Sequence, residues 1–240
     1  MYQPRTYRCW IKDDDLVSFN ATIKETDLYI RAASNLEAEA LKSVIKHRTP
    51  LEEYIKRHPF FLHSLEPCSV ENDAPAIVGV MARAAQIAGV GPMAAVAGAI
   101  AEAVGEDLLV CTPEVVVENG GDVFTKISRT RLIGVYAGGS SFTGKIALEI
   151  SPEETPLGVC TSSGTVGHSL SHGAADAVIV LSRSTALADA AATAIGNRVK
   201  SADDIDVAIG QAQAIDGLAG VVIIKDDKMG MWGSVKLVSV

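Results

Sequence analysis

The order in which hydrophobic periodicity changes along the chain most constrains its fold. Between residues 5 and 33, apolar and polar residues alternate in three short runs, which predicts a three-stranded meander. Helical spacing dominates residues 34–104, and strand-like runs separated by glycine turns return in residues 108–150, followed by single runs at 177–182, 220–227 and 234–240. Since strands cluster at both ends around a helical middle, we expect the α+β class, with an antiparallel sheet and helices packed on one face.

Capping and helix-breaking residues predict where the helices begin and end. Pro50 predicts that the first helix restarts there, and Asp73 predicts the cap of a further helix. Residues 59–72 have little periodicity and are expected to form a loop. Ser184 predicts the cap of an alanine-rich helix that ends at Gly196.

Small residues supply most of the apolar content. The chain is 48% hydrophobic but only 5% aromatic, so its elements are expected to pack closely with little bulk at each contact. The helical half carries weak apolar faces that it cannot bury alone. We therefore expect residues 1–240 to form a single domain.

The charge balance and the hydrophobic pattern limit the partners. The net charge is −8 and the isoelectric point is near 5.1, which argues against nucleic acid as a partner because its binding needs clustered Lys and Arg. The uncharged run at residues 84–101 is interrupted by Gln86 and Pro92, so we expect two short buried helices and no membrane partner. The N-terminus lacks a secretory signal and the four cysteines form no CxxC motif, which predicts a cytoplasmic protein with buried free thiols.

Two glycine-rich segments imitate nucleotide-binding motifs without their context. Residues 139–145 match GxxxxGK, but Ile146 replaces the required Ser or Thr and a strand-like segment follows, which predicts a hairpin loop. Residues 89–94 imitate a dinucleotide fingerprint, but they follow a helical stretch and contain Pro92, which predicts a helix-breaking loop.

Two other small-residue segments are candidate ligand contacts. The first lies between two strand-like runs and consists of Asn119, Gly120, Gly121 and Asp122. These residues are typical of a two-residue hairpin turn, and consecutive glycine amides also let an anionic ligand approach the backbone. The second follows Cys160, is predicted to be a loop, and consists of Thr161, Ser162, Ser163 and Gly164. Its hydroxyl groups leave ligand contact open as an alternative.

A pair of histidines follows this second segment. His168 and His172 are four residues apart, and Asp176 is four further on, which on a helix would suit a metal. The surrounding glycines make a helix doubtful, so the alternative is that one histidine contacts a ligand or acts as an acid or base.

Asp189 and Thr193 lie four residues apart on the alanine-rich helix and therefore share one face. An unpaired buried carboxylate is costly, so Asp189 is expected to be exposed, hydrogen-bonded or bound to a cation. A carboxylate and a hydroxyl are hard oxygen ligands of the kind that Mg²⁺ accepts.

Taken together, ENGGD after a valine-rich strand, then TSSG, then ADAAATAIGN on a helix resembles the ApbE-like superfamily, which includes FAD-dependent protein FMN transferases. The resemblance covers about residues 91–197 and implies a T-fold-like single domain that binds FAD and Mg²⁺. It places the GGD turn, near the flavin nucleotide, on Gly120 to Asp122 and the TSG region on Thr161 to Gly164. It places the metal pair on Asp189 and Thr193.

The sequence also departs from the pattern of this superfamily. The AKG segment falls on residues 96–98, where Ala97 replaces the lysine and the carbonyl of Val96 is a further candidate ligand. The HIIDP segment is absent, and SLSHGAAD in its place makes His172 a partial match as the catalytic residue. The chain therefore looks closest to a shorter cytoplasmic branch whose members are not established flavin transferases.

Three functions remain open from the sequence. The first is a Mg²⁺-dependent transferase or hydrolase that acts on a small flavin-nucleotide-like diphosphate. The second is a non-flavin enzyme of sulfur or amino-acid metabolism of the homocysteine type, in which Cys160 and His172 become the chemical pair. The third is a non-catalytic ligand-binding or assembly protein, because alanine- and glycine-rich helices suit the interface of a homo-oligomer as well as a core.

Overall fold

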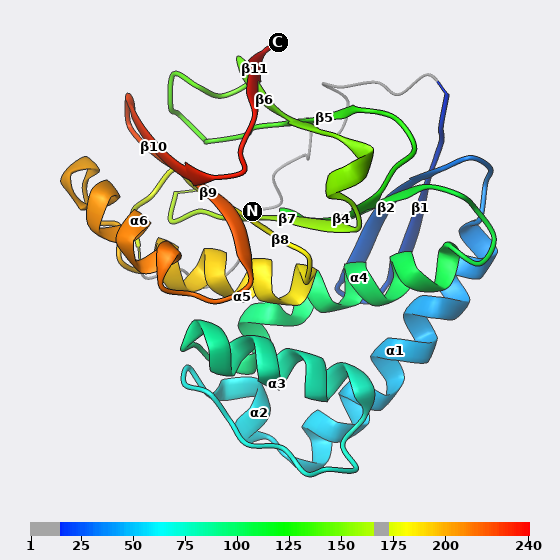
Figure 1. Ribbon diagram of the computed structural model, residues 1–240. Coiled ribbons are helices and arrows are strands. Elements are labelled where there is room, and N and C mark those ends of the chain that lie inside the picture. The colour runs from blue at the N-terminus through cyan, green and yellow to red at the C-terminus, as the bar shows by residue number, and fades with distance from the viewer. Residues whose placement is uncertain (1–14, 166–172) are drawn as a thin grey trace.

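The structure is a computed structural model that describes residues 15–165 and 173–240. Within these ranges, eight strands form one antiparallel sheet in the order β1-β2-β3-β4-β7-β8-β9-β10. They are β1 (Val17–Ile23), β2 (Thr26–Ala32), β3 (Val115–Asn119), β4 (Asp122–Lys126), β7 (Leu157–Ser162), β8 (Ala177–Ser182), β9 (Leu218–Lys225) and β10 (Lys228–Gly233). Strands β2 and β3 are neighbours although the helical middle of the chain separates them in sequence (Figure 1).

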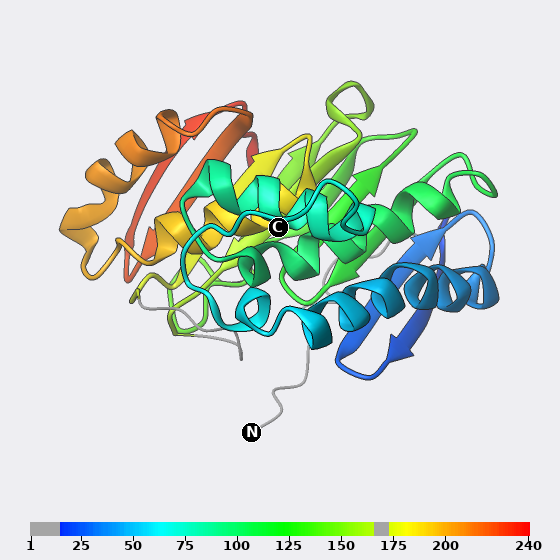
Figure 2. The same cartoon turned by 90° about the horizontal axis from the view of Figure 1, so that it is seen from below.

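The helices cover one face of this sheet (Figures 1 and 2). They are α1 (Glu37–Arg57), α2 (Phe60–His63), α3 (Ala76–Ala88), η2 (Pro92–Ala95), α4 (Val96–Leu108), α5 (Thr185–Gly196), η4 (Ala202–Asp204) and α6 (Ile205–Gln213). A further short helix, η3 (Pro152–Glu154), lies in the connection from β6 to β7 and is not part of this layer (Figure 1). One apolar cluster joins Val117 and Val180 of the sheet to Val104 and Ala188 of the helices, all of them buried. The prediction of an α+β fold with helices on one face is confirmed.

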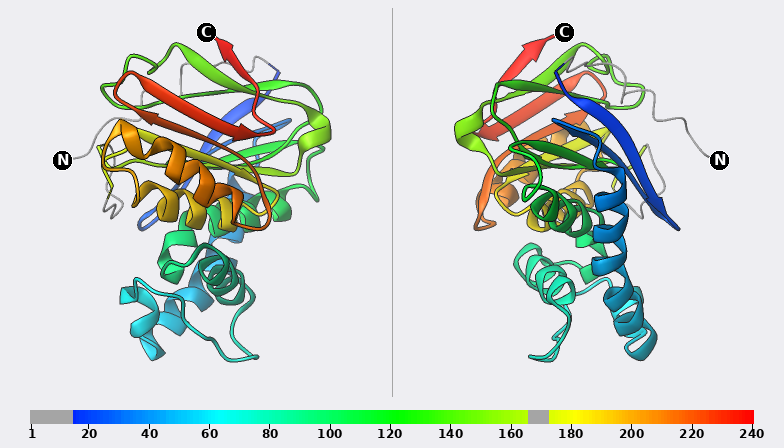
Figure 3. Two further views of the ribbon diagram at one scale, coloured as in Figure 1. Left: turned by 60° about the vertical axis from the view of Figure 1, so that its left-hand side comes forward. Right: turned by 90° about the vertical axis from the view of Figure 1, so that its right-hand side faces the viewer.

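A second, smaller sheet covers the opposite face of the large sheet (Figure 3). It pairs β11 (Leu237–Ser239) with β6 (Ile146–Ile150) and β6 with β5 (Arg131–Gly134), in both cases antiparallel. Leu148 and Ile150 of this sheet pack against Val116, Ile179 and Val222 of the large one in a second apolar cluster. The sequence did not predict this layer, because alternation shows that a strand has a buried face but not which sheet it joins.

Two strands were not predicted from the sequence. Strand β7 has the sequence LGVCTS, and β10 has the sequence KMGMWG. Both contain glycine and few β-branched residues, so their strand propensity is weak. They form because neighbouring strands bind their backbones by hydrogen bonds. Strand β7 pairs with β4 and β8, and strand β10 pairs with β9. The first strand of the predicted meander lies outside the described residues, whereas the other two are β1 and β2.

Pro50 does not restart a helix, so that prediction is wrong. Helix α1 runs without interruption from Glu37 to Arg57 with Pro50 inside it. Proline removes the N–H that would bond to the carbonyl of Lys46, a residue exposed to water. Burial of Leu51 and Tyr54 packs the second half of the helix on the core and offsets this loss.

The other predicted boundaries of the helical region are partly correct. The N-cap of α3 is Pro75, which makes no side-chain hydrogen bond, so Asp73 is not the cap of this helix. The short helix α2 lies inside residues 59–72, which were predicted to form a loop. Gly89 ends α3 with a φ of 73°, as a left-handed C-cap requires. Residues 139–145 connect the antiparallel strands β5 and β6, which confirms the hairpin loop.

No single helix of the described ranges is long and apolar enough to cross a membrane. Helix α3 and the segment from η2 through α4 pass that test only as a pair, with a bend of 105° between them.

Among the cysteines, Cys160 is buried, Cys68 is half-buried and Cys111 is exposed, while Cys9 lies outside the described residues. The expectation of buried thiols therefore holds for Cys160 and is wrong for Cys111.

Candidate functional site

The fold brings the turn between β3 and β4, the end of β7, the first turn of α4 and the middle of α5 to one place. Strand β4 pairs with β3 on one side and with β7 on the other, so the turn lies beside the end of β7. Helix α5 packs on β7, since a Cβ placed on Gly158 would lie 2.5 Å from the Cα of Thr185. Sequence-predicted residues from three separate segments thus meet on the helix side of the sheet.

The predicted two-residue turn is present between Asn119 and Asp122, which pair directly with each other. Gly120 has a φ of 73°, which favours glycine. A Cβ on Gly121 would lie 2.7 Å from the carbonyl oxygen of Thr161, and the Thr161 N–H donates to the Gly121 carbonyl at 2.9 Å. Both glycines are therefore needed to bring the turn against β7.

The strand register decides which side chains of these segments face the helices. Asp122 lies opposite Asn119 and Cys160, and Cys160 belongs to the helix-side cluster. Alternation puts Ser162 on the same face as Cys160 and Thr161 on the opposite face. The Asn119 side-chain amide also donates to the Ala97 carbonyl at 3.1 Å, which ties the turn to α4.

The segment predicted as a hydroxyl-rich loop is half strand. Thr161 and Ser162 belong to β7, whereas Ser163 and Gly164 follow it, so the loop prediction is wrong for the first two residues. The Gly164 N–H donates to the Ala175 carbonyl at 2.9 Å, which holds the segment beside the start of β8. Ser162 lies below the last turn of α5, where a Cβ on Gly196 would be 3.4 Å from its hydroxyl oxygen.

Helix α5 begins and ends as predicted, and Ser184 caps it by accepting from the Leu187 N–H at 3.3 Å. Asp189 and Thr193 are half-buried, whereas the other residues of the helix are buried. The two polar side chains therefore form a single stripe that remains open on an otherwise enclosed helix. This is the shared face that their spacing predicts.

Asp189 also caps a different helix. Its carboxylate accepts from the N–H of Gly98, the third residue of α4, at 2.8 Å. N–H groups in the first turn lack partners within their own helix, so a carboxylate there is favoured. A Cβ on Gly98 would lie 2.4 Å from the Thr185 carbonyl oxygen and 2.8 Å from the Asp189 Cβ, so this approach of α4 to α5 needs glycine. Sequence reasoning aligned Gly98 with the AKG segment but did not predict this contact.

Burial and mutual repulsion shape the electrostatics of the site. Burial raises the pKa of Asp122 to about 7. A hydrogen bond with the Cys160 thiol acts to lower this pKa, and the negative charge of Glu118 acts to raise it. Burial also raises the pKa of Asp189 well above its ordinary value, the Asp122 charge raises it further, and the N–H groups of Gly98 and Ala97 lower it. Within the described residues, no basic side chain is among the groups that shift either carboxyl.

This arrangement fits a cation. Two neighbouring carboxyls without a basic partner are unfavourable when both are ionised, and a divalent cation relieves the repulsion. Asp189, Thr193 and Asp122 offer the hard oxygens that Mg²⁺ prefers. In the described part of the chain, no group of three or more His, Cys, Asp or Glu residues is arranged to hold a metal. Hydroxyl, main-chain or ligand oxygens would therefore have to complete the coordination shell.

The remaining candidate residues do not join this group. His168 and His172 lie outside the described residues. Asp176 is buried, and both its carboxylate oxygens already accept hydrogen bonds, from Thr165 and from the Asp226 N–H. Cys160 is fully buried, and burial, followed by the charges of Asp122 and Asp189, raises the pKa of its thiol. It is therefore not an accessible nucleophile.

Comparison with known proteins gives a consistent family assignment. The family model described as AbpE bacteria matches residues 8–221. A UPF0280 protein of Methanocaldococcus jannaschii is 43% identical over 219 residues, covering 89% of each chain. A UPF0280 protein of Methanococcus vannielii is 40% identical over 227 residues, covering 92% of each chain.

Solved structures share the fold. The flavinyl transferase ApbE of Pseudomonas stutzeri, in its apo form, matches with a TM-score of 0.58 at 13% identity, covering 90% of this chain and 93% of that one. The ApbE protein of Thermotoga maritima matches with a TM-score of 0.58 at 12% identity, covering 87% of this chain and 94% of that one. At such identities the likeness shows the fold alone.

Proposed function

The chain belongs to the family described as AbpE bacteria, and we propose that it binds a flavin-nucleotide-like diphosphate, with FAD as the model ligand, together with Mg²⁺. It would act on that diphosphate as a transferase or hydrolase. The observation that carries the proposal is the pair of neighbouring carboxyls formed by the buried Asp122 on β4 and the half-buried Asp189 on α5, whose pKa values are raised without a basic partner in the described residues.

Each group of residues has a role in this proposal. Asp189 and Thr193 hold the metal from the open stripe of α5, and Asp122 faces it from β4. The carbonyl of Val96, at the start of α4, is a further candidate ligand. When bound, Mg²⁺ would neutralise the diphosphate and polarise the bond that breaks. A cation would offset the charge of the diphosphate and favour the ionised form of both carboxyls, whose pKa values are otherwise raised.

The turn and the end of β7 form the ligand-binding edge. Gly120 and Gly121 let the nucleotide approach the main chain, and Asn119 fixes the turn against α4. Ser162 and Ser163 offer half-buried hydroxyls. The neighbour from Pseudomonas stutzeri is a flavinyl transferase, which supports a flavin nucleotide as the ligand class. A catalytic role for His172 stays a prediction.

Binding measured by thermal unfolding and calorimetry tests the proposal. FAD with Mg²⁺ should raise the melting temperature by several degrees, because a ligand at about 100 times its Kd stabilises a fold by about 2.7 kcal/mol. EDTA, or the substitution Asp189→Ala, should abolish the shift. Asp206→Ala, on the exposed surface of α6, is the matched control and should keep it. If FAD with Mg²⁺ leaves the melting temperature unchanged, the proposal is wrong.

Product analysis then separates catalysis from binding. In a hydrolase, water attacks the FAD diphosphate and the products are FMN and AMP. In a transferase, a nucleophilic group of an acceptor attacks instead, so FMN becomes attached to the acceptor and AMP is released. Chromatography of the incubation mixture distinguishes these two outcomes from unchanged FAD, which would indicate a binding protein.

The two alternatives differ in their structural support. The sulfur-metabolism alternative needs an accessible Cys160, and the burial of that thiol argues against it. Self-association stays a prediction, and Val80 and Ile87, each 43% exposed on α3, are among the exposed apolar side chains of the described residues. Light scattering tests a homo-oligomer directly, since a monomer has a mass of 25.1 kDa.

A further inference from the structure

We infer that Asp176 is a positioning residue for the ligand-binding edge, and this inference rests on the proposed function. Asp176 lies directly before β8 and is 6% exposed. Its carboxylate holds Thr165, which follows the proposed ligand-binding residues Ser163 and Gly164, against the turn between β9 and β10.

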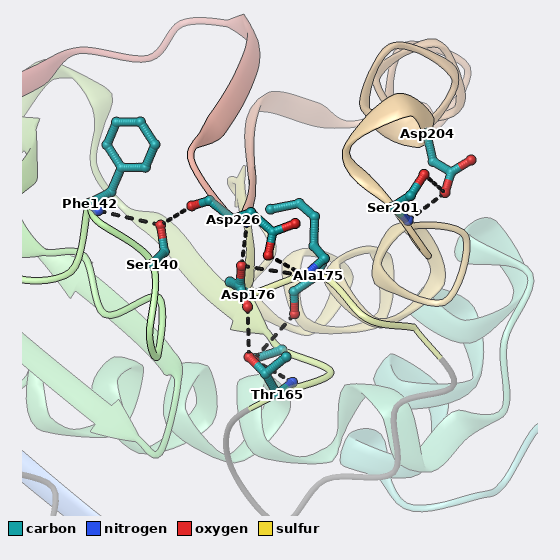
Figure 4. A network of polar contacts seen from close by, with 10 residues as sticks. Ser140, Phe142, Thr165, Ala175, Asp176, Ser201, Asp204 and Asp226 are labelled. Atoms are coloured by element: carbon teal, nitrogen blue, oxygen red, sulfur yellow. Dashed lines mark hydrogen bonds and ion pairs between the residues drawn. The ribbon is translucent and has the colours of Figure 1, made fainter.

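The contacts of Asp176 come from segments that are far apart in sequence (Figure 4). One carboxylate oxygen accepts from the Thr165 hydroxyl at 3.1 Å, and the other accepts from the Asp226 N–H at 2.6 Å. Lys225 lies 3.9 Å from that second oxygen and supplies a nearby positive charge. Beyond Asp226, the Ser140 hydroxyl donates to its carbonyl at 2.6 Å. The carboxylate thus links the segment at Thr165 to the turn between β9 and β10, and the Asp226 carbonyl extends the network to the loop that contains Ser140.

The local backbone makes the segment depend on this anchor. Ser163 and Thr165 are joined to each other, since the Thr165 N–H donates to the Ser163 hydroxyl at 3.1 Å. The Gly164 N–H donates to the Ala175 carbonyl at 2.9 Å, next to Asp176 in the chain. Holding Thr165 therefore holds the path of all three residues.

The hydrogen bond between Asp176 and Thr165 is the anchor, and its place in the fold connects it to the site. The Gly121 carbonyl holds Thr161 from the side of β4, whereas Asp176 holds Thr165 from the side of β9. Ser162 and Ser163 lie between these two fixed points, and both are half-buried. The Ser163 hydroxyl also accepts from the Thr165 N–H at 3.1 Å, so its position depends on that of Thr165. A hydroxyl group binds a ligand well only if its geometry is set before binding.

Two variants test the anchor. Asp176→Asn removes the charge, and Thr165→Ala removes the hydroxyl and the methyl group of an exposed residue, so the second variant is expected to fold even if the first does not. Thr165→Ser keeps the hydroxyl and should restore wild-type behaviour. Ser140→Ala removes the outermost bond of the network and is the matched control.

Amide hydrogen exchange of the ligand-free protein is the first measurement. In Asp176→Asn and Thr165→Ala, exchange at Gly164 should become about tenfold faster, while Thr161 keeps its wild-type rate because its bond to Gly121 is untouched. Unchanged exchange at Gly164 in both variants overturns the inference, and this result does not depend on any ligand.

Calorimetric titration with FAD and Mg²⁺ is the second measurement. Loss of one charge-assisted hydrogen bond that orders the binding segment should weaken binding roughly tenfold in both variants. Thr165→Ser and Ser140→Ala should bind as wild type does. Faster exchange at Gly164 with wild-type affinity shows an anchor that does not position the ligand and overturns the inference. If the wild type binds no FAD, the proposed function fails, whereas the exchange result still decides whether the anchor exists.

Discussion

The two ends of the hairpin formed by β3 and β4 both carry a buried acidic residue, but only one of these residues has a basic partner among the described residues. At one end, Arg131 donates to Asp15 at 2.9 Å and to Glu114, just before β3, at 2.9 Å. At the other end, Asp122 lies with Asp189 and no basic side chain of the described residues shifts either carboxyl.

The pKa values follow this difference. The hydrogen bond from Arg131 lowers the pKa of Asp15 to about 2. Burial pushes the pKa of Glu114 upward, but the hydrogen bond and the charge of Arg131 bring it below its ordinary value. Burial instead raises the pKa of Asp122 to about 7. Where acidic groups serve the fold, the chain supplies the counter-charge itself. Where it supplies none, the proposed Mg²⁺ would supply it.

The largest expected effect is at the paired end. Arg131→Met leaves Glu114 buried without a cation and should lower the free energy of unfolding by about 3–5 kcal/mol. Urea unfolding measures this, in one cooperative transition if the single-domain prediction is correct. Lys228→Met removes an exposed ion pair with Asp203 and should cost less than about 1 kcal/mol. An equal decrease in the free energy of unfolding for the two variants would show that Arg131 is no more important to the fold than an exposed ion pair.

The next effect is a pH dependence at the unpaired end. The folded protein holds the proton of Asp122 up to about pH 7, whereas the unfolded chain releases it near its ordinary pKa of 3.8. The folded state therefore binds more protons in this window, and stability falls as the pH rises through it, by about 4 kcal/mol at most.

Urea unfolding of the metal-free protein between pH 5 and pH 8 checks this window. Asp122→Asn should flatten the decrease. Asp15 and Glu114 act in the opposite direction, but only below about pH 4.5, because their pKa values are lowered from 3.8 and 4.5. Parallel curves for the wild type and Asp122→Asn would show that the carboxyl is not perturbed.

A smaller effect concerns how Asp189 is held. Gly98→Ala puts a Cβ 2.4 Å from the Thr185 carbonyl oxygen, so α4 and α5 must move apart, which should cost about 1–3 kcal/mol. Gly79→Ala, in the interior of α3 where a Cβ meets nothing, is the matched control and should stabilise the protein by about 0.5–1 kcal/mol. Thermal unfolding of both variants distinguishes the two sites, and a neutral Gly98→Ala would contradict the close approach.

The smallest signal is expected from thiol labelling at the unpaired end. Cys160 lies opposite Asp122, fully buried and with a raised thiol pKa, whereas Cys111 is exposed. Iodoacetamide at neutral pH, followed by peptide mass spectrometry, should modify Cys111 and leave Cys160 intact until urea is added. Labelling of Cys160 in the folded protein at the rate of Cys111 would revive the alternative of a reactive thiol.

Much of the site could be predicted element by element. Asn119 to Asp122 form the expected turn, and Asp189 and Thr193 share the expected face, because both patterns depend on residues close in sequence. Thr161 and Ser162 were wrongly expected in a loop, since β7 has weak strand propensity and forms between two neighbouring strands. The predicted helix start at Pro50 failed for a similar reason, because packing of the residues after it keeps α1 continuous.

The sequence by itself determined the periods, the cap at Ser184 and the turn from Asn119 to Asp122, and with them the α+β class and the polar stripe of α5. Only the tertiary structure decided that Asp122 lies near Asp189, that the Asp189 carboxylate accepts from the Gly98 N–H, and that Arg131 pairs with Glu114. The physical reason is that a pattern along the chain reports which side of an element is buried. The distance between two elements depends instead on how closely small residues such as Gly98 and Gly158 let them pack.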